Sequence, residues 1–245
     1  MPKYKRVLLK LSGEVLGEVL TDENNKKHYV GIDFKTVHDF AVKLAEIREA
    51  GIELSLVIGG GNMMRGRNAG AMGLDHVSLD GIGMLGTVMN ALAVKTALEK
   101  LNVPAKVLSA IGMPPVAELY NRERAKKFLS EGNIVLFGAG TGHPFFSTDT
   151  AAALRASELG LDCVIKGTKV DGIYDKDPNE FKDAKLFPKL TYDEAISRNL
   201  KVMDTAAFAL CRENKMPVWV ISINDSEWVK NIIDGVNVGT IVKED

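Results

Sequence analysis

Residues 133–160 (NIVLFGAGTGHPFFSTDTAAALRASELG) place an apolar run, a glycine-rich loop and an Ala-rich segment in immediate succession. The apolar run predicts a buried strand at 134–137, and three glycines within 138–142 let the backbone turn tightly with its N–H groups exposed. Hydroxyl and carboxylate side chains at 147–149 are N-cap candidates for a helix that ends before Gly160. Exposed N–H groups at a helix N-terminus attract anions. The stretch therefore predicts an α/β fold with a candidate phosphate site, although an ordinary tight turn remains the alternative.

Composition narrows the class of protein. The chain has 245 residues, of which 46% are hydrophobic, so it can bury one core without disulfides. A formal net charge of -1 argues against a broad nucleic-acid surface. Cys163 and Cys211 match no metal or disulfide spacing and read as reduced core residues. No uninterrupted apolar run approaches the roughly 18 residues of a membrane span. Lys10 interrupts the apolar start, which we read as a first strand and not a signal peptide. We therefore expect a cytoplasmic protein with no membrane or nucleic-acid partner.

Predicted strands and helices alternate along the chain. The predicted strands are 6–11, 53–58, 105–108, 134–137, 163–166, 217–223 and 239–242. Helices are predicted at 33–50, 82–100, 122–131, 204–215 and 226–234, and another runs from the N-cap candidates at 147–149 to just before Gly160. A short helix is predicted after the capping-box pattern Thr191/Glu194. The polar stretch 17–31 reads as a loop or a surface ribbon. This alternation predicts a three-layer α/β sandwich whose mostly parallel central sheet is covered on both faces, in a single domain over 1–245.

Polar segments follow four of the predicted strands, at 10–13, 59–65, 138–149 and 166–177. Ligands gather beyond the C-terminal ends of the strands in such sheets. These segments bring Lys10, Arg65 and Lys166 to that edge beside glycine loops. A phosphoryl-transfer enzyme needs this combination, because its work is to position anions and stabilise spread negative charge. Each cation taken alone would be an ordinary solvated surface charge.

Carboxylates accompany these cations. Asp149, Asp171, Asp177 and Asp204 could bind Mg²⁺ through water or orient the lysines. Asp149 and Asp204 are also N-cap candidates. For Asp204 the capping role and the lysine-orienting role both remain open, and they are compatible.

Several familiar motifs are misleading or missing. Residues 81–86 match the dinucleotide pattern G-x-G-x-x-G but do not follow a buried strand, so helix packing explains them better. The sequence contains neither a Walker A loop nor the protein-kinase H-R-D. It also lacks the H-x-x-x-H spacing of zinc hydrolases and the G-x-S-x-G elbow of serine hydrolases. A kinase of this sequence must therefore hold phosphate in another way.

Six segments taken together resemble the bacterial uridylate kinases of the amino acid kinase fold family. They are KLSGE at 10–14, GGGNMMRG at 59–66, MLGTVMNALA at 84–93, GTGHPFFSTDTAAALRA at 140–156, KVDGIYDKDP at 169–178 and VMDTAA at 202–207. The resemblance covers nearly the whole chain in matching order. It implies the carbamate kinase-like fold, with the acceptor nucleotide mainly on the N-terminal side and ATP mainly on the C-terminal side. It also implies transfer of the γ-phosphoryl group of ATP to UMP with Mg²⁺, within pyrimidine nucleotide and CTP biosynthesis.

The resemblance also assigns site residues. The implied ATP-binding residues are Lys10, Leu11, Ser12, Gly13, Gly61, Arg65, Thr168, Tyr174 and Asp177. The implied UMP-binding residues are Gly60, Asp80, Thr141, Gly142, His143, Pro144, Phe145, Phe146, Ser147 and Thr148. The implied catalytic residues are Lys10, Arg65, Lys166, Asp149 and Asp204. Mg²⁺ is expected through nucleotide phosphates and water, with no set of protein ligands.

Plainer readings stay open at some of these positions. Asp80 could cap the helix 82–100, and Phe145, Phe146 and Tyr174 could be core aromatics. His143 stands where the family usually has Asn, and 17–29 is a longer polar excursion than the family pattern.

The family resemblance further implies a homohexamer that is activated by GTP and inhibited by UTP. The helix at 84–100 is apolar around much of its girth, which suits a subunit contact or plain core packing. Three alternatives remain: another kinase of this fold that acts on an amino acid or small phosphate, a nucleotide-binding regulator without turnover, and an NAD dehydrogenase.

Overall fold

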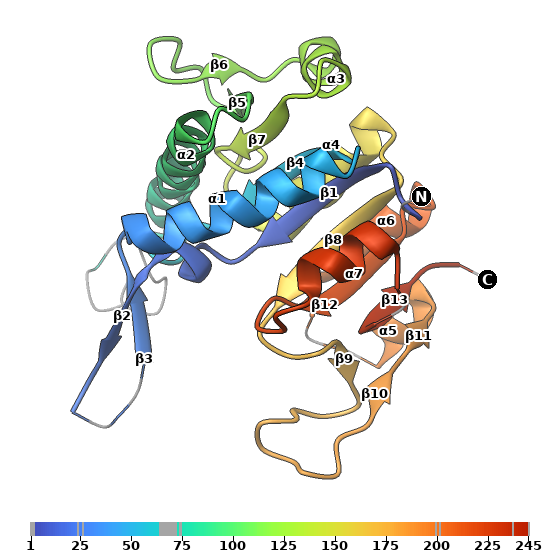
Figure 1. The fold of residues 1–245 in the computed structure, drawn as a ribbon. Coiled ribbons are helices and arrows are strands. Elements are labelled where there is room, and N and C mark those ends of the chain that lie inside the picture. The colour runs from blue at the N-terminus through green and yellow to red at the C-terminus, as the bar shows by residue number, and fades with distance from the viewer. Residues whose placement is uncertain are drawn as a thin grey trace.

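The computed structural model describes residues 3–23, 25, 27–63, 73, 75–198, 200, 202–236 and 238–244. Within these residues, nine strands form the central sheet (Figure 1). The strands are β1 (Arg6–Leu11), β4 (Glu53–Ile58), β5 (Ala105–Ser109), β6 (Glu118–Leu119), β7 (Ile134–Gly138), β8 (Cys163–Thr168), β11 (Lys189–Leu190), β12 (Val218–Ser222) and β13 (Thr240–Val242). Their order is β11-β13-β12-β8-β1-β4-β7-β5-β6. Only the β12–β13 pairing among these strands is antiparallel.

Helices cover both faces of this sheet. They are α1 (Phe34–Glu49), α2 (His76–Lys100), α3 (Arg122–Ser130), α4 (Thr148–Leu159), α5 (Tyr192–Ser197), α6 (Thr205–Glu213) and α7 (Trp228–Asp234). Buried side chains of α1, α2 and α7 join one core cluster, and those of α3, α4, α5 and α6 join the other. Strand β1 serves both clusters, since Val7 and Leu9 belong to the first and Leu8 to the second. The predicted three-layer fold is therefore confirmed.

Smaller elements lie at the carboxyl edge of the sheet. A 3-10 helix η1 (Gly13–Leu16) follows β1, and the antiparallel strands β2 (Glu18–Thr21) and β3 (Lys27–Val30) follow it. Strands β9 (Ile173–Tyr174) and β10 (Leu186–Phe187) form a second small pair. Figure 1 shows both pairs projecting at the end where β1 and β8 finish. The polar stretch after β1 is thus a surface ribbon, one of the two forms that its sequence allowed.

One helix boundary differs from the sequence prediction. Helix α2 begins at His76, six residues before the predicted start, because the Asp75 carboxylate accepts from the Ser78 N–H and caps it. Asp80 therefore lies inside the helix, and the alternative that it caps the helix is wrong. The G-x-G-x-x-G pattern at 81–86 is also interior to α2, which does not place its glycines in a strand-to-helix turn. The dehydrogenase alternative loses its main support.

Candidate active site

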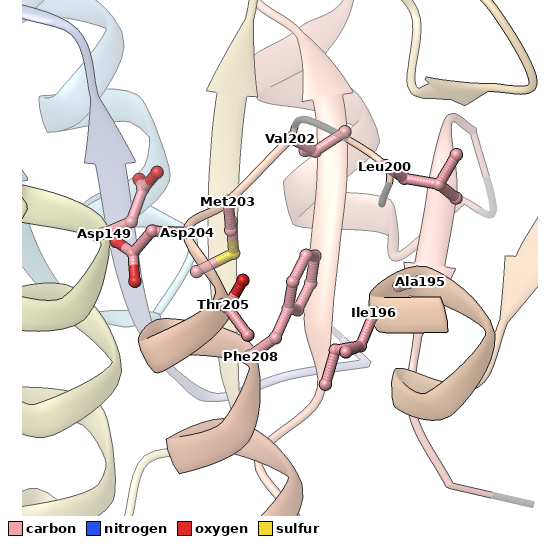
Figure 2. A pocket seen from close by; sticks show the side chains of 9 residues that line it. All are labelled: Asp149, Ala195, Ile196, Leu200, Val202, Met203, Asp204, Thr205 and Phe208. Carbon is pink, nitrogen blue, oxygen red and sulfur yellow. The ribbon is translucent and has the colours of Figure 1, made fainter. Parts of the chain in front are cut away.

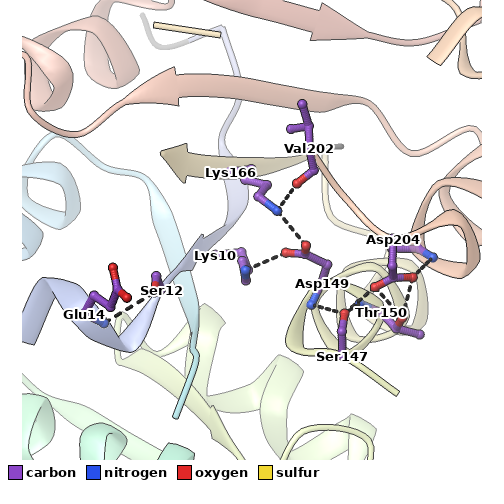
Figure 3. Close-up of polar contacts among 10 residues, drawn as sticks. Lys10, Ser12, Glu14, Ser147, Asp149, Thr150, Lys166, Val202 and Asp204 are labelled. Carbon is purple, nitrogen blue, oxygen red and sulfur yellow. Dashed lines mark hydrogen bonds and ion pairs between the residues drawn. The ribbon is translucent and has the colours of Figure 1, made fainter. Parts of the chain in front are cut away.

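Two lysines meet at the carboxyl edge because of strand register. Lys10 on β1 and Lys166 on β8 are direct partners in a parallel pair, so their side chains point to the same face. Asp149, in the first turn of α4, lies between them. Its Oδ1 forms an ion pair with Lys10 Nζ at 2.6 Å, and its Oδ2 accepts a hydrogen bond from Lys166 Nζ at 2.5 Å (Figure 3). We call these three residues the lysine–aspartate triad.

The triad is removed from water, with each residue only 9% exposed. Burial alone would raise the pKa of the Asp149 carboxyl, but the Lys10 and Lys166 ammonium groups outweigh it and hold that pKa below its ordinary value. Burial, and then the like charge of Lys10, lower the pKa of Lys166 to about 8 against the opposing attraction of Asp149. Lys166 also donates to the carbonyl of Val202. The geometry thus holds two cations and one anion in a fixed arrangement suited to a polyanionic ligand.

Asp204 has the capping role, one of the two compatible roles that the sequence left open. Its carboxylate accepts from the hydroxyls of Ser147 and Thr150 and from the Ala207 N–H, which caps α6. Among the contacts of the described residues, these donors occupy it in place of a lysine. Asp204 therefore ties the N-terminus of α4 to that of α6 and supports Asp149 through the helix that carries it.

The loop after β1 packs tightly on the loop after β4. A Cβ on Gly13 would lie 2.2 Å from the Gly59 carbonyl oxygen, so only glycine fits there. The buried amides of Asn62 and Asn90 complete this contact, since they bond to each other at 2.8 and 2.9 Å and Asn90 donates to the Gly59 carbonyl at 2.7 Å. Sequence reasoning missed this pair of asparagines. The available signal was a polar residue in the apolar run MLGTVMNALA.

The remaining residues of the 10–13 segment have backbone roles here. Ser12 caps η1 by accepting from the Glu14 N–H at 3.4 Å. The Leu11 side chain is fully buried, and its carbonyl accepts from the Gly59 N–H at 2.9 Å. Arg65, the third predicted cation, lies outside the described residues.

A cavity of about 210 Å³, which we call the α2 cavity, opens beside α2. Its lining includes six residues predicted to bind UMP or to lie between the nucleotides: Gly60, Gly61, Asp80, His143, Phe146 and Thr148. Asp80 Oδ2 accepts from the Phe145 N–H at 2.6 Å and contacts His76 Nδ1 at 3.1 Å. The α2 cavity therefore has one carboxylate anchored on its wall.

The loop between β7 and α4 forms the rest of that wall. Ala139 and Phe145 have left-handed backbone angles, φ 60° and 70°, which non-glycine residues adopt at a cost. Thr141 Oγ1 accepts from the His143 N–H at 3.2 Å. Gly142 and Pro144 lie in the same loop, and Ser147 uses its hydroxyl to cap α4.

The aromatic residues of the site are not core residues. Phe145 is 70% exposed and Phe146 is 53% exposed, so the alternative that they pack in the core is wrong. The Phe145 ring stacks on the His76 ring with centroids 5.2 Å apart. Tyr174 is half-buried, and its hydroxyl lies 3.4 Å from Asp171.

A second cavity, of about 410 Å³, lies along the loop after β8, and we call it the loop cavity. Tyr174 and Asp177 line it, as do Leu200 and Val202. Thr168 does not line it, but the Thr168 hydroxyl donates at 2.6 Å to the carbonyl of Val170, which does. These three predicted ATP-side residues, Thr168, Tyr174 and Asp177, therefore lie in one region of the surface.

A third cavity, also of about 410 Å³, lies between α5 and α6 and was not anticipated from the sequence. Figure 2 shows Asp149 and Asp204 on one side of this α6 cavity and Ala195, Ile196 and Leu200 on the other. Its walls come from segments far apart in the sequence, which explains why no local pattern signals it. Asp149 links it to Thr148 of the α2 cavity, and Val202 lines both it and the loop cavity. Asp149 itself lines the α6 cavity, and Lys166 donates to the Val202 carbonyl, so members of the triad or their direct neighbours border all three cavities.

The described residues offer no cluster of three or more His, Cys, Asp or Glu side chains that could hold a metal ion. Both oxygens of Asp149 face ammonium groups, and Asp204 accepts three protein donors. This donor set fits a metal ion whose ligands are mainly water and substrate phosphate oxygens.

Comparison with known proteins identifies the relatives of this chain. A model of the amino acid kinase family matches residues 5–222. The structure of a UMP kinase from Bacillus anthracis is 38% identical, covers 100% of this chain and 98% of its own, and superposes with a TM-score of 0.91. A UMP kinase from Ureaplasma parvum is 34% identical over 99% of this chain and 100% of its own, with a TM-score of 0.89. An aspartate kinase from Synechocystis is 19% identical, covers 98% of this chain and 40% of its own at a TM-score of 0.70, and shares the fold.

We predict that the Lys166 amine titrates near pH 8, because burial and Lys10 disfavour its charged form. Competitive acylation across pH, read by mass spectrometry, measures the uncharged fraction of this amine. In Asp149→Asn the same amine should titrate at a lower pH, because the carboxylate that favours its charge is gone. Titration of Lys166 near the ordinary value of 10.5 would contradict the described environment.

Proposed function

This chain belongs to the amino acid kinase family, and we propose on that premise that it is a UMP kinase, which transfers the γ-phosphoryl group of ATP to UMP and yields ADP and UDP. The observation that carries the proposal is the buried lysine–aspartate triad, whose members or direct neighbours border the α2 cavity, the α6 cavity and the loop cavity. Two structures that match this chain over nearly their full length are UMP kinases, which favours UMP over an amino acid as acceptor. We place the reaction in the cytoplasm, in pyrimidine nucleotide biosynthesis.

The triad supplies what phosphoryl transfer requires. Negative charge spreads over the equatorial oxygens of the transferred group in the transition state. Lys10 and Lys166 are already fixed by Asp149 before substrate arrives, so little reorganisation opposes their stabilising effect. A UMP phosphate oxygen is an anionic nucleophile, so no general base is needed. The protein therefore acts by position and charge.

The two nucleotides occupy opposite sides of the triad in this proposal. UMP lies in the α2 cavity, with its ribose hydroxyls donating to Asp80 and its phosphate near Gly60 and Thr148. The 141–147 loop surrounds the uracil. ATP lies with its adenosine in the loop cavity against Tyr174 and Asp177 and its phosphates toward Lys10. Ser12, Gly13, Gly61 and Arg65 complete the proposed phosphate contacts.

We propose that Mg²⁺ enters as a complex with ATP. Mg²⁺ keeps several waters and needs only one or two carboxylates beside substrate phosphates. Asp149 and Asp204 are the residues able to meet it, through water, because their oxygens already accept protein donors. When bound, the ion neutralises charge on the phosphate oxygens.

Assembly and control remain proposals that rest on the family. Ile82, Leu85 and Met89 form an apolar stripe on α2 and are 37%, 52% and 47% exposed, which suits a subunit contact. We propose the homohexamer on this basis. Activation by GTP and inhibition by UTP are further proposals of the same family origin.

An acceptor panel tests the proposed reaction. The protein is incubated with ATP, Mg²⁺ and UMP, aspartate or glutamate in turn, and nucleotides are separated by chromatography. We expect UDP and ADP to form together with UMP far faster than product forms with either amino acid. Equal rates with UMP and aspartate would rule out the assignment, and ATP binding without turnover would favour the nucleotide-binding regulator.

Lys10→Ala should lower kcat for UMP by on the order of 10² or more, because preorganised positive charge is lost.

Asp80→Asn tests the placement of UMP. We predict a larger rise in KM for UMP than in KM for ATP, because the carboxamide has lost one acceptor oxygen for the ribose hydroxyls. Asp75→Asn is the matched control on the same helix, since asparagine caps as well as aspartate. A larger rise in KM for ATP than in KM for UMP would instead place ATP in the α2 cavity and UMP in the loop cavity.

A further inference from the structure

Lys169 in the loop after β8 reaches the ribbon β2–β3 and the turn after β1. Lys169 Nζ lies 3.8 Å from the centroid of the Tyr29 ring on β3 and 2.8 Å from Glu14 Oε2 on η1. We call Tyr29, Lys169 and Glu14 the clasp. It joins three segments that are distant in the sequence, namely the ribbon, the turn after β1 and the loop after β8. The ribbon is also the part of the chain that the proposed reaction leaves without a role.

Both ends of the clasp adjoin segments assigned to ATP. Glu14 follows Ser12 and Gly13, which are proposed to meet the phosphates. Lys169 follows Thr168 and precedes Val170, which lines the loop cavity. A contact between Glu14 and Lys169 therefore sets the spacing between the phosphate end and the adenosine end of one ligand. Its effect on affinity should fall on ATP and not on UMP.

The ribbon is built to present Tyr29 at this point. Tyr29 pairs with Val19 across the ribbon. Gly17 brings the start of β2 against β3, because a Cβ there would lie 2.9 Å from Val30 N and 3.2 Å from Tyr29 Cβ. This close approach fixes the base of the ribbon on η1, beside Glu14. Tyr29 is half-buried, so its ring face is held beneath the ammonium group.

The backbone of Lys169 is anchored independently of its side chain. Asn224 Nδ2 donates to the Lys169 carbonyl at 3.2 Å, and the Thr168 carbonyl accepts from the Ile223 N–H at 2.9 Å. Removal of the side chain should therefore leave the loop folded. A two-stranded ribbon has little stability of its own, so the clasp also stabilises the ribbon.

We propose that the ribbon is an ATP-positioning element, in which Tyr29 holds Lys169 against Glu14 and so fixes the loop after β8 at the distance that ATP requires. This inference rests on the proposed placement of ATP. Tyr29 and Lys169 are positioning residues, because they act through the two segments that they join. Binding linkage is reciprocal, so ATP must stabilise the closed clasp by the same factor by which the clasp favours ATP.

Kinetic constants of four variants test the proposal. Tyr29→Leu and Lys169→Met should each raise KM for ATP roughly three- to tenfold, the range expected from a cation–aromatic contact with a partly exposed ion pair. KM for UMP should stay unchanged. Tyr29→Phe keeps the ring face and should behave as the unmodified protein. Lys106→Met is the matched control, because Lys106 lies 5.6 Å from the Phe128 ring and away from the cavities.

A double variant separates positioning from general destabilisation. Tyr29→Leu combined with Lys169→Met should raise KM for ATP no more than Lys169→Met does, because the two residues act through one contact. Additive effects, equal effects on both nucleotides, or an unchanged KM for ATP in both single variants would overturn the inference.

Hydrogen exchange gives a readout that does not depend on turnover. Saturation with a nonhydrolysable ATP analogue should increase amide protection in Glu18–Thr21 and Lys27–Val30, and Lys169→Met should abolish the increase. If calorimetry shows the analogue bound but amide protection in the ribbon does not increase, this inference alone is wrong. Failure of the acceptor panel would instead remove the UMP kinase assignment.

Discussion

One carboxylate holds two buried ammonium groups together at the carboxyl edge of the central sheet. Lys10 and Lys166 repel each other across neighbouring strands, and burial further lowers the pKa of Lys166. Asp149 offsets both effects by placing one oxygen on each lysine, at 2.6 and 2.5 Å. A polyanionic ligand would complete this arrangement. The two ammonium groups and one carboxylate leave a net positive charge that suits a phosphate ligand. The surrounding structure holds these three side chains in place.

The fold maintains this arrangement through elements that converge from separate parts of the chain. Parallel register between β1 and β8 aligns the lysines, and the first turn of α4 delivers Asp149. Asp204 then ties α4 to α6 through Ser147 and Thr150. In the proposed function, the α2 cavity and the loop cavity receive UMP and ATP separately, with the phosphates of both directed toward the same cations. The clasp links the turn after β1 to the loop after β8, the two segments to which the proposal assigns ATP.

Sequence patterns predicted seven of the nine strands of the sheet and the two triad lysines at the ends of β1 and β8, because alternation and glycine loops are local signals, but the two-residue strands β6 and β11 were missed. The start of α2 was missed, since Asp75 caps the helix within a stretch that otherwise reads as irregular. The pairing of Asn62 with Asn90 and the α6 cavity depend on contacts between distant segments, which no local pattern encodes. Likewise, only the structure shows that Asp204 caps α6 and ties it to α4 through Ser147 and Thr150.

The most direct test of the central claim is the rate of the chemical step in Asp149→Asn. Rapid-quench single turnovers with saturating ATP and UMP isolate phosphoryl transfer from binding and product release. If Asp149 preorganises Lys10 and Lys166, the transfer rate in the folded variant should fall by on the order of 10² or more. A transfer rate near that of the unmodified protein would contradict the claim that this carboxylate organises the reaction.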